Sequence, residues 1–174
     1  MMADLVDMGK LMLFGEIDLI SSQQVYEFVN MHNARRRKFK SLEIIVNSSG
    51  GMINQCFAII DIMTSSEIPI HTTAVGEILS SGLLIFAAGA RGHRLVHRNV
   101  SVMSHQISGE VSGKIHEIES AQTDWRYAHQ RMWLHLTQCS NLTGDEVRQH
   151  LLPSHDVWLT PAELIQYGLA DGYK

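Results

Sequence analysis

Short apolar runs that end in glycine or polar residues alternate with helical stretches along this chain, and this alternation limits the fold more than any other feature. Three runs predict buried strands, at 11–14, 42–46 and 70–75. Helical spacing predicts a helix over 22–34, with Ser21 and Gln24 as its capping box, and another over 52–64. Strands alternating with helices predict an α/β fold with parallel crossovers, in which the carboxyl ends of the strands face one crevice.

The second half of the sequence continues the pattern with shorter strands and one long helix. An almost wholly apolar segment over 80–88 predicts a short helix buried on all sides. The other expected elements are strands at 94–96 and 100–105 and helices at 115–138, 143–152 and 160–168. Thr143 with Glu146 and Thr160 with Glu163 predict capping boxes at the starts of the last two helices. Residues 106–114 contain two glycines and predict an extended loop or hairpin, and the mixed surface of the long helix predicts that it projects and pairs.

The composition predicts one globular domain and argues against several classes of protein. Of the 174 residues, 45% are apolar and 18% are charged, which suits a single sizeable core. The net charge of −4 argues against nucleic-acid and membrane partners, and no apolar stretch approaches the ~18 residues of a membrane span. No export signal precedes the first apolar run, so we expect a soluble, unexported protein. Cys56 and Cys139 form no CxxC pair and the histidines lack zinc-site spacing, so no metal is expected.

Three predicted strand ends carry residues suited to acyl-transfer chemistry: Gly50-Gly51, Ser80-Ser81 and His105. A serine in the first turn of a buried helix lies near backbone N–H groups, which favour a negative charge developing beside it. A histidine at the end of an adjacent strand can accept the hydroxyl proton, and several aspartates remain candidates to orient it. Taken singly, these residues also suit a plain turn, a helix cap and a core histidine.

Four blocks of sequence resemble the proteolytic subunit of the Clp protease, ClpP. In chain order they are Asn47-Ser48-Ser49-Gly50-Gly51, then Gly76-Glu77-Ile78-Leu79-Ser80-Ser81-Gly82 with Ala87-Ala88-Gly89-Ala90-Arg91-Gly92, then Val102-Met103-Ser104-His105-Gln106, and finally Asp156-Val157-Trp158-Leu159-Thr160-Pro161-Ala162-Glu163 with Tyr167-Gly168-Leu169-Ala170-Asp171. The resemblance covers roughly 11–172, nearly the whole chain, so it is one of a whole domain.

The resemblance implies a serine endopeptidase with a Ser-His-Asp triad. The nucleophile, the general base and acid, and the orienting carboxylate would be Ser80, His105 and Asp156, with Asp145 as the alternative carboxylate. The oxyanion hole would be formed by the backbone N–H groups of Gly51 and Ser81. Substrate-binding residues would be Gly50, Met52 and Ile53. The implied reaction is peptide hydrolysis through an acyl-enzyme, with no cofactor held by the chain itself.

The resemblance also implies a fold and an assembly. The fold would be ClpP/crotonase-like, with repeated strand-helix units in a single domain over 1–174 and a projecting handle segment over 106–139. Such chains form two stacked heptameric rings, a tetradecamer, in the cytoplasm of a bacterium or a phage-infected host. The rings enclose sites for unfolded polypeptide, which an AAA+ unfoldase feeds using ATP. Because this chain starts close to its first core strand, where the family has a longer segment that contacts the unfoldase, we expect that docking to be altered.

Several residues depart from the family pattern, and more than one function is compatible with the sequence. Ile78, Leu79 and Ser81 replace two alanines and a methionine beside the nucleophile, which predicts a narrower or reshaped substrate pocket. A short, divergent chain of this kind also suits a phage capsid-maturation protease. A catalytically inactive scaffold subunit or a crotonase-like acyl-CoA enzyme would have the same fold class, but the presence of all three triad candidates argues against both.

Overall fold

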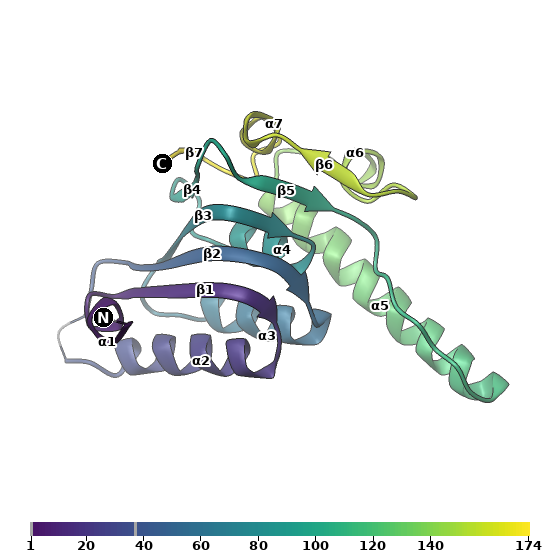
Figure 1. Cartoon of the computed structure of the whole chain (residues 1–174), viewed down its shortest axis with the longest axis horizontal. Helices are drawn as coiled ribbons and strands as arrows, with labels where there is room; N and C mark the ends of the chain where they lie inside the picture. The colour runs from purple at the N-terminus through teal and green to yellow at the C-terminus, as the bar shows by residue number, and fades with distance from the viewer. Residues whose placement is uncertain (1, 37) are drawn as a thin grey trace.

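A mainly parallel sheet with helices packed on it makes up the computed structural model, which describes residues 2–36 and 38–174 (Figure 1). The strands are β1 (Lys10–Ile17), β2 (Leu42–Gly51), β3 (Ile70–Leu79), β4 (Arg94–Val96), β5 (Ser101–Ser104), β6 (Val157–Leu159) and β7 (Gly172–Tyr173). The helices are α1 (Met2–Asp7), α2 (Leu19–Asn33), α3 (Ile53–Thr64), α4 (Ser81–Ala87), α5 (Ile115–Cys139), α6 (Gly144–His150) and α7 (Pro161–Gln166). The expected α/β class is confirmed.

The strand order places the carboxyl ends of the long strands along one side of the molecule. The path runs β1-β2-β3-β4-β7 and every pairing on it is parallel. One edge of β3 pairs first with β4 and then, through Glu77 to Leu79, with β5. β6 adds to β5 in the antiparallel direction. The ends of β1, β2, β3 and β5 therefore meet on the side from which α5 projects (Figure 1).

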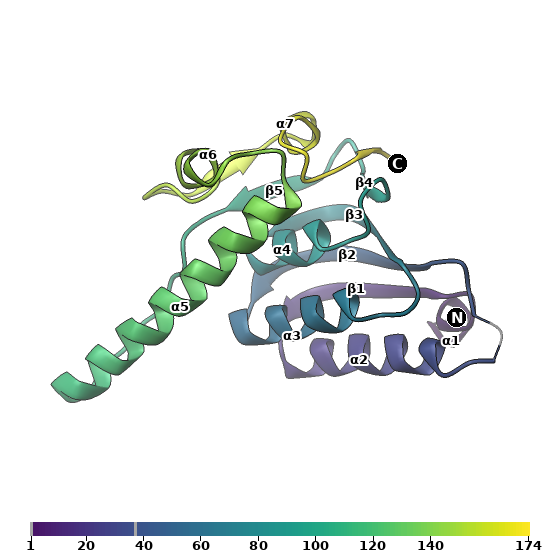
Figure 2. The same cartoon turned by 180° about the vertical axis from the view of Figure 1, so that it is seen from behind.

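Helices α2, α3 and α4 cover one face of the sheet, and the core lies between (Figure 2). All seven residues of α4 are buried, as its apolar sequence predicted. The core is built from aliphatic side chains of the strands and helices, among them Ile17, Ile44, Ile59, Ile78 and Leu84. None of the helices in the described chain has both the length and the apolar character needed to cross a membrane.

Several boundaries differ from the predicted ones. α2 begins at Leu19, because its N-cap is Asp18, whose carboxylate accepts the Ser21 N–H while the Ser21 hydroxyl accepts the Asp18 N–H; the predicted Ser21–Gln24 box is wrong. β2 and β3 continue through the polar, glycine-containing residues that were expected to end them. The capping boxes at Thr143 and Thr160 are confirmed. The short elements α1, β6 and β7 were not predicted.

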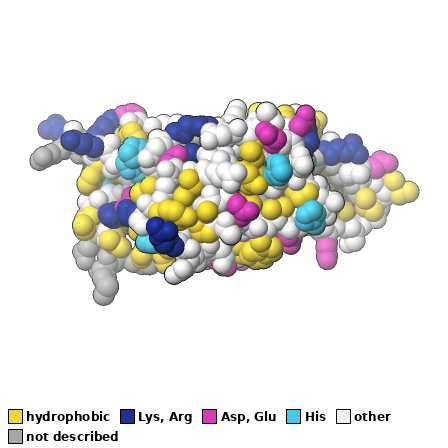
Figure 3. Space-filling view, turned by 90° about the horizontal axis from the view of Figure 1, so that it is seen from above, with side chains coloured by type: hydrophobic (Ala, Val, Ile, Leu, Met, Phe, Trp, Pro, Cys, Tyr) yellow, Lys and Arg dark blue, Asp and Glu magenta, His cyan; other side chains and the backbone are white. Residues whose placement is uncertain are grey.

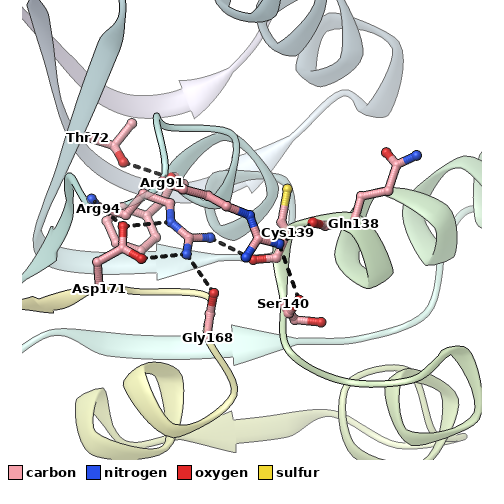
Figure 4. A network of polar contacts seen from close by, with 9 residues as sticks. Thr72, Arg91, Arg94, Gln138, Cys139, Ser140, Gly168 and Asp171 are labelled. Atoms are coloured by element: carbon pink, nitrogen blue, oxygen red, sulfur yellow. Dashed lines mark hydrogen bonds and ion pairs between the residues drawn. The ribbon is translucent and has the colours of Figure 1, made fainter.

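Helix α5 is fixed to the sheet at its carboxyl end by a buried arginine (Figure 4). The Arg94 side chain is 2% exposed, and its guanidinium donates to both carboxylate oxygens of Asp171 and to the carbonyls of Cys139 and Gly168. Arg91 donates to the carbonyls of Gln138 and Ser140 nearby. The other end of α5 extends away from the sheet, and residues 111–120 are all exposed.

The face that carries β6 and α7 has a mixed surface. Hydrophobic side chains gather toward its middle, and Lys and Arg side chains form separate small groups among them (Figure 3). Trp158 of β6 is 63% exposed and Tyr173 of β7 is 39% exposed. The basic side chains that the structure describes on this face are therefore divided among hydrophobic ones.

Candidate active site

Ser80 lies in the sharp turn that joins β3 to α4, in a backbone conformation that residues other than glycine rarely adopt. Its φ is 52° and its ψ is −121°, and within 2–36 and 38–174 it is the one residue other than glycine with a positive φ. The turn is held in place because the Ser80 N–H donates to the carbonyl of Met103 at 2.9 Å and the Ser80 carbonyl accepts the Leu83 N–H at 3.0 Å. A conformation of this kind costs about 1–3 kcal/mol and concentrates at functional sites.

His105 follows β5, and its imidazole contacts the Ser80 hydroxyl. Nε2 lies 2.8 Å from Oγ, which is hydrogen-bond distance. The two residues meet because Leu79 and Met103 are partners in the parallel register of β3 and β5. When Nε2 is unprotonated, the hydroxyl donates to it, which is the arrangement of an activated nucleophile and its base. The structure brings Ser80 and His105 together, and their catalytic roles stay predictions.

Asp156 lies immediately before β6, at the position that faces His105 across the β5–β6 pair. The antiparallel register pairs Val102 with Leu159 and Ser104 with Val157, so His105 and Asp156 come next on the two strands. Directly opposite residues in such a pair have β-carbons about 4.5–5.5 Å apart. The Asp156 side chain is exposed, and in the described chain no hydrogen bond or ion pair joins it to His105. The alternative, Asp145, is 97% exposed and pairs with Arg148 on α6 at 3.2 Å.

Gly50, Gly51 and Ser81 surround the nucleophile on the side of β2. Gly50 is buried against the turn, and a β-carbon added to it would meet the Leu79 carbonyl oxygen at 2.9 Å. The Ser81 hydroxyl donates to the Gly51 carbonyl at 3.4 Å, so these two residues are neighbours. Ser81 is the first residue of α4, where a backbone N–H has no intrahelical acceptor. The predicted oxyanion-hole residues are therefore adjacent to each other and to Ser80.

A cavity of about 200 Å³ opens beside Ser80 and His105. It is lined by Gly51, Met52, Ile53, Ser80, His105, Gln106, Ile107, Ser108 and Met132. Two of the three predicted substrate-binding residues, Met52 and Ile53, line it, whereas Gly50 lies buried behind Ser80. Ile78 is fully buried in the core and neither it nor Leu79 lines the cavity, so their bulk does not narrow this space.

Residues 106–108 and Met132 are lining residues that sequence reasoning missed. Met132 is one of four buried residues on the partly exposed helix α5. Its position in the apolar stripe of the predicted helix was the available signal, but that stripe does not tell which element it faces. Residues 106–108 were expected only as part of a loop or hairpin.

The two cysteines are not placed to compete as nucleophiles. Cys56 lies behind the site with its sulfur 3.5 Å from the Ser81 carbonyl oxygen, and burial raises the pKa of its thiol. Burial also raises the pKa of the Cys139 thiol, although the charges of Arg94 and Arg91 oppose this. Across the described residues, no group of three His, Cys, Asp or Glu side chains is arranged to hold a metal ion.

Comparisons with known proteins place the site in context. A sequence profile of the family described as Clp protease matches residues 1–173. The chain is 26% identical over 133 residues to ATP-dependent Clp protease proteolytic subunit 4, chloroplastic, of Arabidopsis thaliana, an alignment that covers 76% of this chain and 45% of that protein. It is 32% identical over 130 residues to ATP-dependent Clp protease proteolytic subunit 1 of Salinibacter ruber, covering 75% of this chain and 55% of that protein. The chain thus spans about half the length of these relatives.

Proposed function

Because the chain belongs to the Clp protease family, we propose that it is a serine endopeptidase whose single domain hydrolyses peptide bonds through an acyl-enzyme. The observation that carries the proposal is the 2.8 Å contact between Ser80 Oγ and His105 Nε2. It is supported by the positive φ of Ser80, since the surrounding structure holds this residue in a strained conformation that a structural turn would fill with glycine.

The proposed reaction begins with proton transfer from Ser80 to His105. As Oγ attacks the carbonyl carbon of the substrate, its proton passes to Nε2, and the carbonyl oxygen becomes an oxyanion. His105 then donates that proton to the leaving amine as the peptide C–N bond breaks. Water attacks the resulting ester, gives its proton to Nε2, and the acid product leaves as Ser80 regains the proton. Asp156 would orient the imidazole and stabilise its protonated form.

The oxyanion would be stabilised by the backbone N–H groups of Gly51 and Ser81. Their adjacency is supported by the contact between the Ser81 hydroxyl and the Gly51 carbonyl. Backbone donors fixed before the reaction starts need no reorganisation, and the loss of one such donor typically costs about 100-fold or more in rate. Gly50 would serve by letting β2 approach Ser80 closely.

The proposed substrate is an unfolded polypeptide that enters a homo-oligomer of two stacked heptameric rings. The exposed apolar residues of α5 support pairing with another copy, since Ile115 is 77% exposed, Tyr127 64% and Leu134 48%. Native mass spectrometry of the purified chain tests the number of copies. A monomer at micromolar concentration is the contrary result.

Any use of ATP is proposed to belong to a partner protein and not to this chain. Both relatives named above carry ATP-dependent in their names. An AAA+ unfoldase that hydrolyses ATP would supply unfolded chain, and the peptidase itself would cleave short peptides without ATP. Cleavage of a short fluorogenic peptide in the absence of ATP tests this division of labour.

Labelling with a fluorophosphonate serine probe tests the proposed nucleophile. We expect one labelled residue, Ser80, identified by mass spectrometry, and no labelling in Ser80→Ala or His105→Ala. Ser101→Ala, which changes an exposed serine of β5, is the matched serine control and should retain labelling at Ser80. Absence of labelling in an assembled preparation would favour the inactive scaffold, whereas labelling elsewhere would overturn the assignment of Ser80. A role in phage capsid maturation stays a prediction that this experiment does not address.

A further inference from the structure

The two residues that flank His105 both hold the segment that leads to Asp156. The Ser104 hydroxyl donates to the Leu151 carbonyl at 2.6 Å, and the Gln106 side-chain amide donates to the Leu152 carbonyl at 2.9 Å. The first of these hydrogen bonds is buried, and Ser104 is 3% exposed. The first bond satisfies the carbonyl of Leu151, the C-cap of α6, and the second satisfies the carbonyl of the residue that follows it.

The segment from Leu151 to Val157 is fixed at both of its ends to the same strand. At its start, Leu151 and Leu152 are buried in the core. The carbonyl of Leu151 accepts from Ser104 of β5, and that of Leu152 accepts from Gln106. At its end, Val157 is the ladder partner of Ser104. Ser104 thus contacts one end through its hydroxyl and the other through its backbone. The short span between them contains Asp156.

We infer that Ser104 and Gln106 are positioning residues, which set Asp156 opposite His105 so that its carboxylate can orient the imidazole. The inference rests on the proposed function. It gives a role to two neighbours of His105 that take no part in the proposed reaction. They act through Asp156 and not on the substrate. A segment with only one fixed end would let Asp156 move away, because its side chain is exposed and no group in the described chain bonds to its carboxylate.

Gln106 lines the cavity, so a direct contact with substrate is the competing explanation. The two explanations differ in what they predict for the Michaelis constant and for coupling to Asp156. A substrate contact changes KM and is independent of Asp156. A positioning residue changes kcat and loses its effect once the Asp156 carboxylate has gone.

The test uses the full chain, a fluorogenic peptide and the variants Gln106→Leu, Asp156→Asn and their combination. We expect Gln106→Leu to lower kcat roughly tenfold with KM within about twofold, and to cost less than about twofold in the Asp156→Asn background.

Controls separate positioning from folding. Gln149→Leu changes an exposed glutamine of α6 and should leave both constants unchanged. Ser104→Thr keeps the hydroxyl and should retain more activity than Ser104→Ala, with circular dichroism checking that both are folded. If Gln106→Leu lowers kcat by the same factor in the wild-type and Asp156→Asn backgrounds, or changes KM alone, the inference is overturned. The protease proposal would remain intact. A wild-type chain that neither labels at Ser80 nor cleaves would overturn the proposed function itself.

Discussion

Gly50 and Ser80 are packed so closely that a β-carbon added to Gly50 would lie 2.8 Å from the β-carbon of Ser80. The φ of Gly50 is also 96°, a value that other residues rarely adopt. We therefore expect Gly50→Ala to lower the free energy of unfolding by about 2–3 kcal/mol and to displace the Ser80 turn. Urea unfolding and the rate of fluorophosphonate labelling measure the two effects, and labelling should fall at least roughly tenfold.

Gly92→Ala provides the matched control for that prediction. Gly92 has a φ of 84°, but a β-carbon there would have no atom within 4 Å. Only the conformational cost of about 1–2 kcal/mol applies, and labelling at Ser80 should be unchanged. Equal labelling defects in Gly50→Ala and Gly92→Ala would show that the contact with Ser80 is not the cause.

The strained backbone of Ser80 predicts an unusual order of stability among its variants. Glycine adopts a φ of 52° without steric cost, whereas alanine keeps the strain. We expect Ser80→Gly to unfold at a higher urea concentration than Ser80→Ala, with a free-energy difference of about 1 kcal/mol. Both variants lack the hydroxyl, so neither should label. An alanine variant as stable as the glycine variant would contradict the strain.

The buried guanidinium of Arg94 predicts a large loss of stability in Arg94→Met. The substitution keeps much of the apolar stem but leaves the carbonyls of Cys139 and Gly168 without their donor. It also removes the charged partner of Asp171, whose carboxylate keeps only the backbone N–H of residue 94 from this network. We expect a loss of about 3 kcal/mol or more, measured by urea unfolding. Arg98→Met is the control, since Arg98 is exposed and stacks on Tyr173, and its cost should stay below about 1 kcal/mol. Similar costs for the two variants would contradict the role of the network.

His32 predicts a loss of stability in mild acid. Its Nε2 donates to the Val6 carbonyl at 2.9 Å, while Nδ1 has no hydrogen-bond partner among the described residues. Burial, helped by the charge of Arg35, lowers the pKa of His32, although the Val6 carbonyl and Asp7 oppose this. The folded state therefore favours neutral His32, and its contribution is complete above about pH 6.5 and is lost as the pH falls below that value.

The variant His32→Gln tests this sign, because glutamine can donate to Val6 and does not titrate. We expect the wild-type chain to lose more unfolding free energy than the variant between about pH 7.5 and about pH 5.5. Other histidines contribute equally to both proteins, so the difference between them isolates His32. Parallel pH profiles for the two proteins would contradict the prediction.

The sequence predicted the elements whose hydrophobic pattern is long or whose ends are capped locally. The buried helix α4 and the capping boxes at Thr143 and Thr160 follow from neighbouring residues alone. The continuation of β2 to Gly51 and of β3 to Leu79 does not, because those polar residues are extended only by pairing with neighbouring strands. The three-residue strand β6 and the two-residue strand β7 depend on tertiary pairing in the same way.

The candidate site shows the same division. Ser80 and His105 could be selected from strand ends and from family resemblance, and the structure brings them into contact. The positive φ of Ser80 was not predictable, because it depends on how the β3–α4 turn packs beside β5. The lining of the cavity by Met132 and Ile107 was not predictable either, because it depends on how α5 and the segment before it lie against the sheet. The role of Asp156 stays a prediction.

Residues 106–114 run beside α5 outside the regular helices and strands that the structure describes. Their amide hydrogens are therefore expected to exchange with solvent within seconds in an isolated subunit, while those of β2 and β3 exchange only on global unfolding. Any partner or substrate that adds a strand along this segment would protect these amides first. Hydrogen–deuterium exchange at 106–114 thus reports whether a partner or a substrate covers this segment, even in variants that have lost all catalysis.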